Sequence, residues 1–196
     1  MPAGADLVAV GKRAGRPSPK QDHVSRLLVD HAQTGARVVR LKSGDGGIFG
    51  RLEEEILALQ EAGICYEIIP ASPQPVRRRR RRDPLTRRLT ARRVQFITGA
   101  DTTGNLPDDL NWAALADPLA TTVVFMGKRT FPRLAEALVA HGLPPDTPAL
   151  LAEAVGHPDQ SLHRSTIAAL ATSLAGGRSD KPALILYGPL ADPAEG

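Results

Sequence analysis

Two glycine-rich segments carry residues whose types and spacing suit the binding of a ligand. The first reads Val10-Gly-Lys-Arg-Ala-Gly15, and the second reads Ser43-Gly-Asp-Gly-Gly-Ile-Phe-Gly50, with Arg40 and Lys42 just before it. Glycines let a backbone approach a ligand closely, and an Asp in such a loop can accept hydrogen bonds from a ribose or an ammonium group. A third candidate, Phe125-Met-Gly127, follows an apolar run. These three segments are the candidate binding loops.

Simpler interpretations of the same residues are still open at this point. A glycine-rich turn with an Asp is more often only a turn, Lys12 and Arg13 are more often solvated, and Met126 is more often a core residue. Cys65 has no activating partner in the sequence and is expected to be a small buried hydrophobe. The five histidines have no metal-binding spacing: His23, His31, His141, His157 and His163. The residue types alone therefore indicate an α/β ligand-binding protein.

The elements that must position these loops alternate between apolar runs and helical patterns. Short apolar runs predict buried strands at residues 7–10, 38–41, 66–69, 94–98, 122–126, 149–151 and 183–187. Apolar spacing and terminal glycines predict helices around residues 24–28, closed by Gly35, and at residues 53–62, 134–141 and 166–174. This alternation predicts an α/β fold with a largely parallel sheet. The candidate loops follow predicted strands, and such strand ends are where α/β proteins place their sites.

Composition limits the class of protein. The chain has 196 residues, of which 42% are hydrophobic, enough for one domain or two small ones. One cysteine excludes a disulfide scaffold and a cysteine-based metal cluster. The sequence contains neither an apolar run of membrane-spanning length nor the apolar core of a signal peptide at its N-terminus. A cytoplasmic protein without a membrane partner is the expectation.

The positive charge comes from one segment. The formal net charge is +4 and the calculated pI is about 9.6, but residues 77–93 contain ten arginines against the single acid Asp83. The rest of the chain carries 15 basic and 20 acidic residues and is mildly acidic. A block of like charges normally stays solvated and disordered. We therefore expect a basic linker here, and the pI is a poor argument for nucleic-acid binding.

The amino-acid sequences of the loops and their order along the chain indicate a family. The chain resembles the uroporphyrinogen-III C-methyltransferases of the tetrapyrrole methylase family, whose loops read VGKRAG and RLKGGDPFIFGRG, against VGKRAG at residues 10–15 and RLKSGDGGIFGR at residues 40–51. The likeness continues in collinear order over nearly the whole chain. It includes Phe96-Ile-Thr-Gly99, Asn111-Trp-Ala-Ala-Leu115, Val124-Phe-Met-Gly127 and Gly142-Leu-Pro-Pro-Asp-Thr-Pro148.

The resemblance implies a fold and an activity. It implies the tetrapyrrole methylase fold, with two α/β lobes and the cofactor in the cleft between them, usually as a homodimer. The implied activity is S-adenosyl-L-methionine-dependent methylation of uroporphyrinogen III to precorrin-2, on the way to sirohaem or cobalamin. Methyl transfer from a sulfonium is an in-line displacement, so such a protein mainly positions donor and acceptor and handles a proton.

The resemblance also assigns roles to individual residues. Lys12 corresponds to the lysine proposed as the proton donor. Six residues correspond to cofactor contacts: Ser43, Gly44, Asp45, Ile48, Met126 and, through its backbone, Val155. Four residues supply cations for the carboxylates of the substrate: Arg13, Arg16, Arg40 and Lys42. No metal ligand is implied. The chain departs from the family at four places: Ser43, Gly46-Gly47, Leu52 and Ala154-Val155.

Two segments of the family pattern have no counterpart. The family begins with a strand, a GAGPGDP loop and a Tyr-Asp-Arg segment, and this chain starts after them, so we expect an N-terminally truncated first lobe. A PGITSA-type loop should follow Ile69, but after Pro70 residues 71–83 are rich in Pro and Arg. One added base in a possible codon string for residues 71–78 yields Gly-Ile-Thr-Ala-Ala-Ser-Ala-Ala. This predicts a frameshifted segment at residues 71–83.

These observations predict a domain organisation and a function. We expect a partial N-terminal α/β lobe at residues 1–70, a basic disordered linker at 71–90, a C-terminal α/β lobe at 91–190 and a tail at 191–196. The expected function is the methylation of uroporphyrinogen III, with this chain impaired or inactive. The alternatives are another methyltransferase of the same fold, acting on ribosomal RNA or on later corrins, and a non-catalytic basic fragment that binds RNA or another polyanion.

Overall fold

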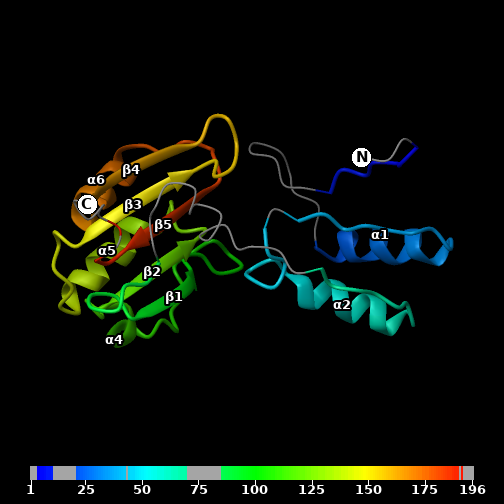
Figure 1. Cartoon of the computed structure of the whole chain (residues 1–196), viewed down its shortest axis with the longest axis horizontal. Coiled ribbons are helices and arrows are strands. Elements are labelled where there is room, and N and C mark those ends of the chain that lie inside the picture. The colour runs from blue at the N-terminus through cyan, green and yellow to red at the C-terminus, as the bar shows by residue number, and fades with distance from the viewer. Residues whose placement is uncertain (1–3, 11–20, 43, 70–84, 190, 192–196) are drawn as a thin grey trace. The chain divides into compact units, whose positions relative to one another are not determined.

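The chain divides into two compact units, Met1–Ala71 and Ser72–Gly196. A computed structural model describes residues 4–10, 21–42, 44–69, 85–189 and 191. Figure 1 shows two helices in the first unit and a five-stranded sheet with its helices in the second. The expected linker lies mostly outside the described residues. Its described end, residues 85–90, forms a turn that a bridge between Arg87 and Ala91 closes.

Two helices that contact each other form the first unit, α1 (Gln21–Gln33) and α2 (Leu52–Glu61). Both were expected from apolar spacing. The end of α2 shows why the sequence predicts its position so well. Gly63 has a positive φ of 68°, and its N–H donates to the carbonyl of Gln60 at 3.0 Å, while the N–H of Ile64 donates to Leu59 at 2.9 Å. This pair of bonds is the Schellman motif, which favours glycine at its left-handed position.

The prediction of three strands in the first unit was wrong. Residues 7–10, 38–41 and 66–69 have no sheet pairing, and Leu7 and Ile69 are 75% and 80% exposed. A strand forms only where a neighbouring backbone accepts and donates its hydrogen bonds, and the described part of this unit contains no partner strand. Cys65 is exposed for the same reason, so the expectation that it is buried was also wrong.

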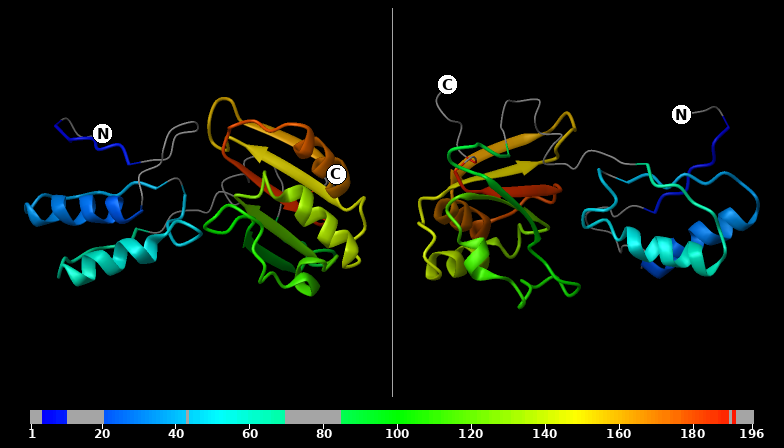
Figure 2. Two further views of the ribbon diagram at one scale, coloured as in Figure 1. Left: turned by 180° about the vertical axis from the view of Figure 1, so that it is seen from behind. Right: turned by 60° about the horizontal axis from the view of Figure 1, so that its bottom comes forward.

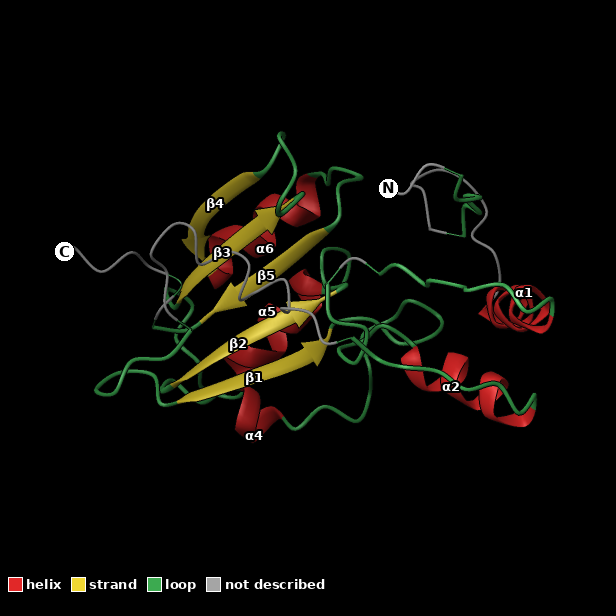
Figure 3. Cartoon of the chain, turned by 45° about the vertical axis from the view of Figure 1, so that its right-hand side comes forward, coloured by secondary structure: helices red, strands yellow, loops and turns green. Residues whose placement is uncertain are grey.

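The second unit is built on five strands: β1 (Arg93–Thr98), β2 (Ala120–Phe125), β3 (Pro148–Glu153), β4 (Ser161–Thr166) and β5 (Ala183–Tyr187). Their order across the sheet is β1-β2-β5-β3-β4. β1 and β2 are parallel, while β5 is antiparallel to both of its neighbours, β2 and β3. β1, β2 and β3 therefore run in the same direction and end at the same edge of the sheet, as the arrowheads in Figure 3 show.

The sheet corrects two expectations from the sequence. A largely parallel sheet was wrong, because three of the four strand pairings are antiparallel. β4 was missed because its sequence, Ser-Leu-His-Arg-Ser-Thr, contains one apolar residue and lacks the apolar run of a buried strand. It is an edge strand that pairs with β3 after a connection of seven residues, 154–160, and sheets of this kind tolerate a polar outer face.

Helices cover one face of the sheet. α5 (Phe131–Ala140) and α6 (Ile167–Gly176) pack together over it, and α4 (Trp112–Leu115) adds Leu115 to the same core (Figure 2). Phe131, Leu134 and Ile167 are fully buried there. The apolar spacing of both long helices therefore faces the sheet, as their sequences predict.

The opposite face of the sheet carries a second, smaller core. Val123, Leu150 and Leu186 are buried on it and pack with Leu85 and Ala191. Ala191, which the sequence assigned to the tail, is thus part of the core. Within the described ranges, none of the helices has the length and apolar character needed to cross a lipid bilayer.

Candidate functional site

The second glycine-rich segment forms a closed turn, residues 44–50, here called the glycine loop. The side-chain Oδ1 of Asp45 accepts a hydrogen bond from the N–H of Gly47 at 2.8 Å, and the N–H of Ile48 donates to the Asp45 carbonyl at 3.4 Å. Gly50 approaches the Gly46 carbonyl so closely that a Cβ on Gly50 would collide with it. Glycine is therefore required at position 50 by the close approach of backbone to backbone.

The two cations before the glycine loop share one buried carboxylate. Glu55, on α2, is 3% exposed. Its Oε1 accepts from Arg40 Nε at 3.2 Å and from Gln21 Nε2 at 3.3 Å, and its Oε2 lies 2.9 Å from Lys42 Nζ. Lys42 Nζ also donates to the carbonyl of Gly50 at 2.6 Å. Burying a carboxylate is costly unless it is paired, so this cluster fixes α1, α2 and the glycine loop to one another.

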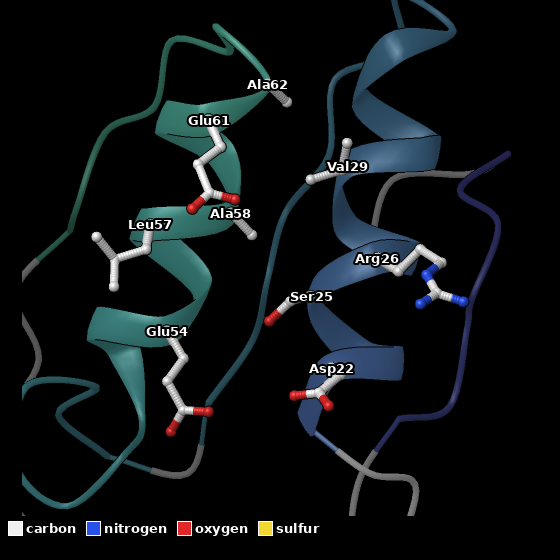
Figure 4. A pocket seen from close by; sticks show the side chains of 9 residues that line it. All are labelled: Asp22, Ser25, Arg26, Val29, Glu54, Leu57, Ala58, Glu61 and Ala62. Atoms are coloured by element: carbon white, nitrogen blue, oxygen red, sulfur yellow. The ribbon is translucent and has the colours of Figure 1, made fainter.

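Two hollows lie among the described residues of the first unit, and Gly44, Asp45 and Ile48 line neither of them. One of about 610 Å³ lies between α1 and α2 and is rimmed by Asp22, Glu54 and Glu61 (Figure 4). The other, of about 510 Å³, lies between residues 6–10 and 36–41 and the side of α1 that carries Leu27. The candidate site of this unit is therefore the glycine loop with its cations, of which Arg40 also lines the second hollow.

In the second unit, the carboxyl ends of β1 and β2 meet closely. A Cβ on Gly99 would lie 2.6 Å from the Cα of Gly127 and 2.9 Å from a methyl of Val124. The hydroxyl of Thr130, which is buried, donates to the carbonyl of Gly99 and to that of Gly127. Met126 therefore stands beside a rigid junction of two strand ends, and its side chain is 56% exposed.

An ion pair joins the end of β3 to the same edge. Lys128 Nζ lies 2.7 Å from Glu153 Oε1 and also donates to the hydroxyl and the carbonyl of Ser179. Burial raises the pKa of Glu153, but the hydrogen bonds from Lys128 and Ser179 and the charge of Lys128 outweigh it, so this pKa is below its ordinary value. Met126 lies two residues before Lys128 and Val155 lies two residues after Glu153, so the pair links the two segments that carry them.

Backbone strain is concentrated in these loops. Among the described residues other than glycine, those with a positive φ are Phe49, Arg51, Met126 and Ala154, at 50°, 55°, 54° and 47°. The left-handed conformation costs such a residue roughly 1–2 kcal/mol. The first two flank Gly50, and the others follow β2 and β3. Strain of this kind persists where the surrounding structure holds it, and it is common at binding sites.

The structure brings together some of the predicted residues. Gly44, Asp45 and Ile48 share the glycine loop, with Arg40 and Lys42 beside it, while Met126 and Val155 share an edge of the second unit. Four predicted residues lie outside the described part of the chain: Lys12, Arg13, Arg16 and Ser43.

Sequence reasoning missed the residues that hold these loops. Glu55 looked like one of three consecutive acids in solvent, yet it lies four residues before the buried Leu59 and so on the same face of α2. That spacing was the available signal. Lys128 and Glu153 had none, since they are 25 residues apart and pair only because β2 and β3 end together.

Comparison with known proteins identifies the family of this chain. A profile of the tetrapyrrole (corrin/porphyrin) methylases matches residues 5–171. The chain belongs to the tetrapyrrole methylase family. The family resemblance and the mixed α/β fold expected from the sequence are both confirmed.

Individual tetrapyrrole methylases are similar over nearly all of this chain. A siroheme synthase from Gluconobacter oxydans is 40% identical over 193 residues, covering 94% of this chain and 39% of that protein. A uroporphyrinogen-III C-methyltransferase from Synechococcus elongatus is 35% identical over 189 residues, covering 96% and 75%. The crystal structure of uroporphyrin-III C-methyl transferase from Thermus thermophilus complexed with S-adenyl homocysteine has a TM-score of 0.76 and 31% identity, covering 88% of this chain and 75% of that chain.

Proposed function

We propose that this tetrapyrrole methylase binds S-adenosyl-L-methionine and methylates uroporphyrinogen III, giving precorrin-2 for sirohaem or cobalamin. Relatives at 35% and 31% identity carry that activity in their names, and one of them was crystallised with S-adenyl homocysteine. The observation that carries the proposal is the position of the backbone strain. Met126 is itself one of the residues that the family motif assigns to the cofactor, and the strained Phe49 and Ala154 each adjoin another, Ile48 and Val155.

The residues present fit this cofactor. Glycine backbone and the Asp45 carboxylate offer polar contacts in the first unit, and the exposed Met126 offers an apolar contact in the second. S-adenosyl-L-methionine supplies an electrophilic methyl group when it is bound. We assign Lys12 to proton donation, and Arg13, Arg16 and Arg40 to the carboxylates of the substrate.

We also propose that the chain as it stands is a weak enzyme. Residues 71–83 replace the PGITSA-type loop of the family with Pro and Arg. The loss of a loop that contacts the cofactor removes binding energy directly. The frameshift hypothesis explains the replacement, and resequencing codons 70–84 of the gene tests it.

Calorimetric titration with S-adenosylhomocysteine tests both proposals. We expect measurable binding by the chain as it stands, and binding at least about tenfold tighter when residues 71–78 are replaced by Gly-Ile-Thr-Ala-Ala-Ser-Ala-Ala, a gain of about 1.4 kcal/mol. In that restored chain, Lys12→Met should abolish methyl transfer to uroporphyrinogen III and leave the Kd for S-adenosylhomocysteine unchanged. Absence of binding by both chains would refute the proposed function, and equal binding would refute the impairment.

A second candidate function follows from the arginine run. Arg87, Arg88 and Arg92 are exposed, which favours a polyanion-binding surface. Binding to RNA that weakens steeply with salt and disappears when Arg77–Arg82 are replaced by Ala would support it. A homodimer and a cytoplasmic location are further proposals, tested by analytical ultracentrifugation and by cell fractionation.

A further inference from the structure

Glu55 occupies an unusual place for a carboxylate. It is 3% exposed, accepts hydrogen bonds from Gln21 on α1 and from Arg40, and forms an ion pair with Lys42, which lies in the same segment as Arg40. The adjacent Glu54 is 43% exposed and, among the described residues, pairs with the nearby Arg51 at 2.6 Å and 2.7 Å. Two neighbouring acids on one helix thus have different environments, and the buried one contacts the groups beside the glycine loop.

Lys42 connects Glu55 to the glycine loop, because its side chain contacts both. Its ammonium donates to the Gly50 carbonyl at 2.6 Å while it contacts Glu55 at 2.9 Å. Its aliphatic stem passes beneath Gly46, where a Cβ would lie 2.9 Å from Lys42 Cδ. Gly46 and Gly50 in turn contact each other across the loop. The position of the Lys42 ammonium group therefore helps to set how closely Gly46 and Gly50 approach each other.

We propose that Glu55 is a positioning residue for the cofactor loop. It holds the ammonium of Lys42 against Gly50 and thereby keeps the glycine loop in its binding conformation; this inference rests on the proposed function. It also changes the role of Lys42. The sequence assigned Lys42 to the substrate, whereas its two contacts within the fold make it a support of the loop, and Arg40 is the more exposed cation of the pair, at 28% against 15%.

The test compares Glu55→Gln with Glu54→Gln, which removes a charge one residue away. Amide hydrogen exchange of peptides covering residues 44–50 should accelerate roughly tenfold in Glu55→Gln, because opening of the loop then costs less free energy. The Kd for S-adenosylhomocysteine should rise about tenfold in the same variant. Both quantities should stay within twofold of the wild type in Glu54→Gln.

A second variant keeps the test decisive if Glu55→Gln does not fold. Lys42→Met retains the stem beneath Gly46 and removes the ammonium, so it should accelerate exchange in residues 44–50 as well. In a double-mutant cycle, the losses of S-adenosylhomocysteine affinity from Lys42→Met and Glu55→Gln should be non-additive, since both break the same contact. Additive losses, or unchanged exchange in both variants, would overturn the proposal.

The two proposals fail in different ways. If neither the wild-type chain nor the chain with residues 71–78 replaced binds S-adenosylhomocysteine, the proposed function is refuted, and the exchange rates of residues 44–50 still decide whether Glu55 holds the loop. If the wild type binds and Glu55→Gln binds equally well with an unchanged loop, the role of Glu55 is refuted and the proposed function stands.

Discussion

Met126 is a single residue whose backbone conformation lowers the stability of the protein and whose side chain is proposed to contact the cofactor. Its φ of 54° lies in the left-handed region, and its side chain is more than half exposed. The conformation brings little packing in return. The neighbouring junction of Gly99, Gly127 and Thr130 holds it in place. Backbone strain that the surroundings hold in place at an exposed residue is common at binding sites, which supports the proposed role of Met126 in binding.

Replacing Met126 with Gly should therefore stabilise the protein and weaken the site. Relief of the left-handed strain gives roughly 1–2 kcal/mol, and the greater flexibility of Gly in the unfolded chain costs roughly 0.5–1 kcal/mol. We expect the free energy of unfolding of the second unit, from urea denaturation, to rise by their difference, and the affinity for S-adenosylhomocysteine to fall.

Met126→Leu is the control, since it keeps both the strain and an apolar side chain. It should match the wild type in both measurements. A less stable Met126→Gly variant, or one that binds S-adenosylhomocysteine as well as the wild type, would contradict this interpretation.

At the scale of elements, strand ends are joined by side chains rather than by backbone. β2 and β3 are not neighbours, because β5 lies between them. The pair of Lys128 and Glu153 nevertheless links the loops that follow them and ties both to Ser179, before β5. Met126 and Val155 lie in the two segments that this pair joins.

Glu153→Gln should lower the free energy of unfolding of the second unit at pH 7 by about 1.5–3 kcal/mol, the usual range for a hydrogen bond to a charged group. Lys181→Met provides the control. It removes a pair with Asp159 in which both side chains are well exposed, and exposed pairs contribute little. Equal losses in the two variants would show that the buried pair has no special role.

The same pair predicts a pH dependence. The pKa of Glu153 in the folded protein is below its ordinary value of 4.5. Its contribution to stability is therefore complete above pH 4.5 and is lost as the pH falls through the folded pKa. The difference in urea midpoint between the wild type and Glu153→Gln should be constant near neutral pH and shrink in acid. A difference that grows in acid would contradict the assignment.

At the scale of the whole molecule, the two units differ in how much apolar surface they bury. The second has two apolar clusters on the two faces of a sheet. In the described part of the first unit, the buried apolar side chains are Val24 and Leu59, and Glu55 adds a charged cluster. Because apolar burial is the main source of stability, the first unit should be much the weaker.

Hydrogen exchange of the full chain should reveal this difference. Amides of α1 and α2 should exchange through local opening and before those of β2 and β5, which should require global unfolding. Saturating S-adenosylhomocysteine should slow exchange in residues 44–50 more than in β5. Equal protection of α1 and β5 without ligand would show that the first unit has a core as strong as the second.

Local features of this protein were determined by its sequence alone. Helices α1, α2, α5 and α6 were expected near their true positions, and the ends at Gly63 and Gly142 follow from bonds between residues at most five positions apart. Strand β5 was expected with its correct bounds. The family could also be recognised from the sequence, because its loops are short continuous motifs. Apolar spacing, helix caps and motifs all act over a few residues, so a sequence carries them in full.

Only the tertiary structure decided which segments find partners. Residues 38–41 have the composition of a strand and pair with no strand among the described residues, whereas the polar β4 is paired with β3. Likewise, only the fold shows that Lys42 and Glu55 share one buried contact and that Lys128 reaches Glu153. Pairing and burial depend on groups that are distant in sequence. The free energy gained from pairing and burial is available only after the chain has folded and brought those groups together.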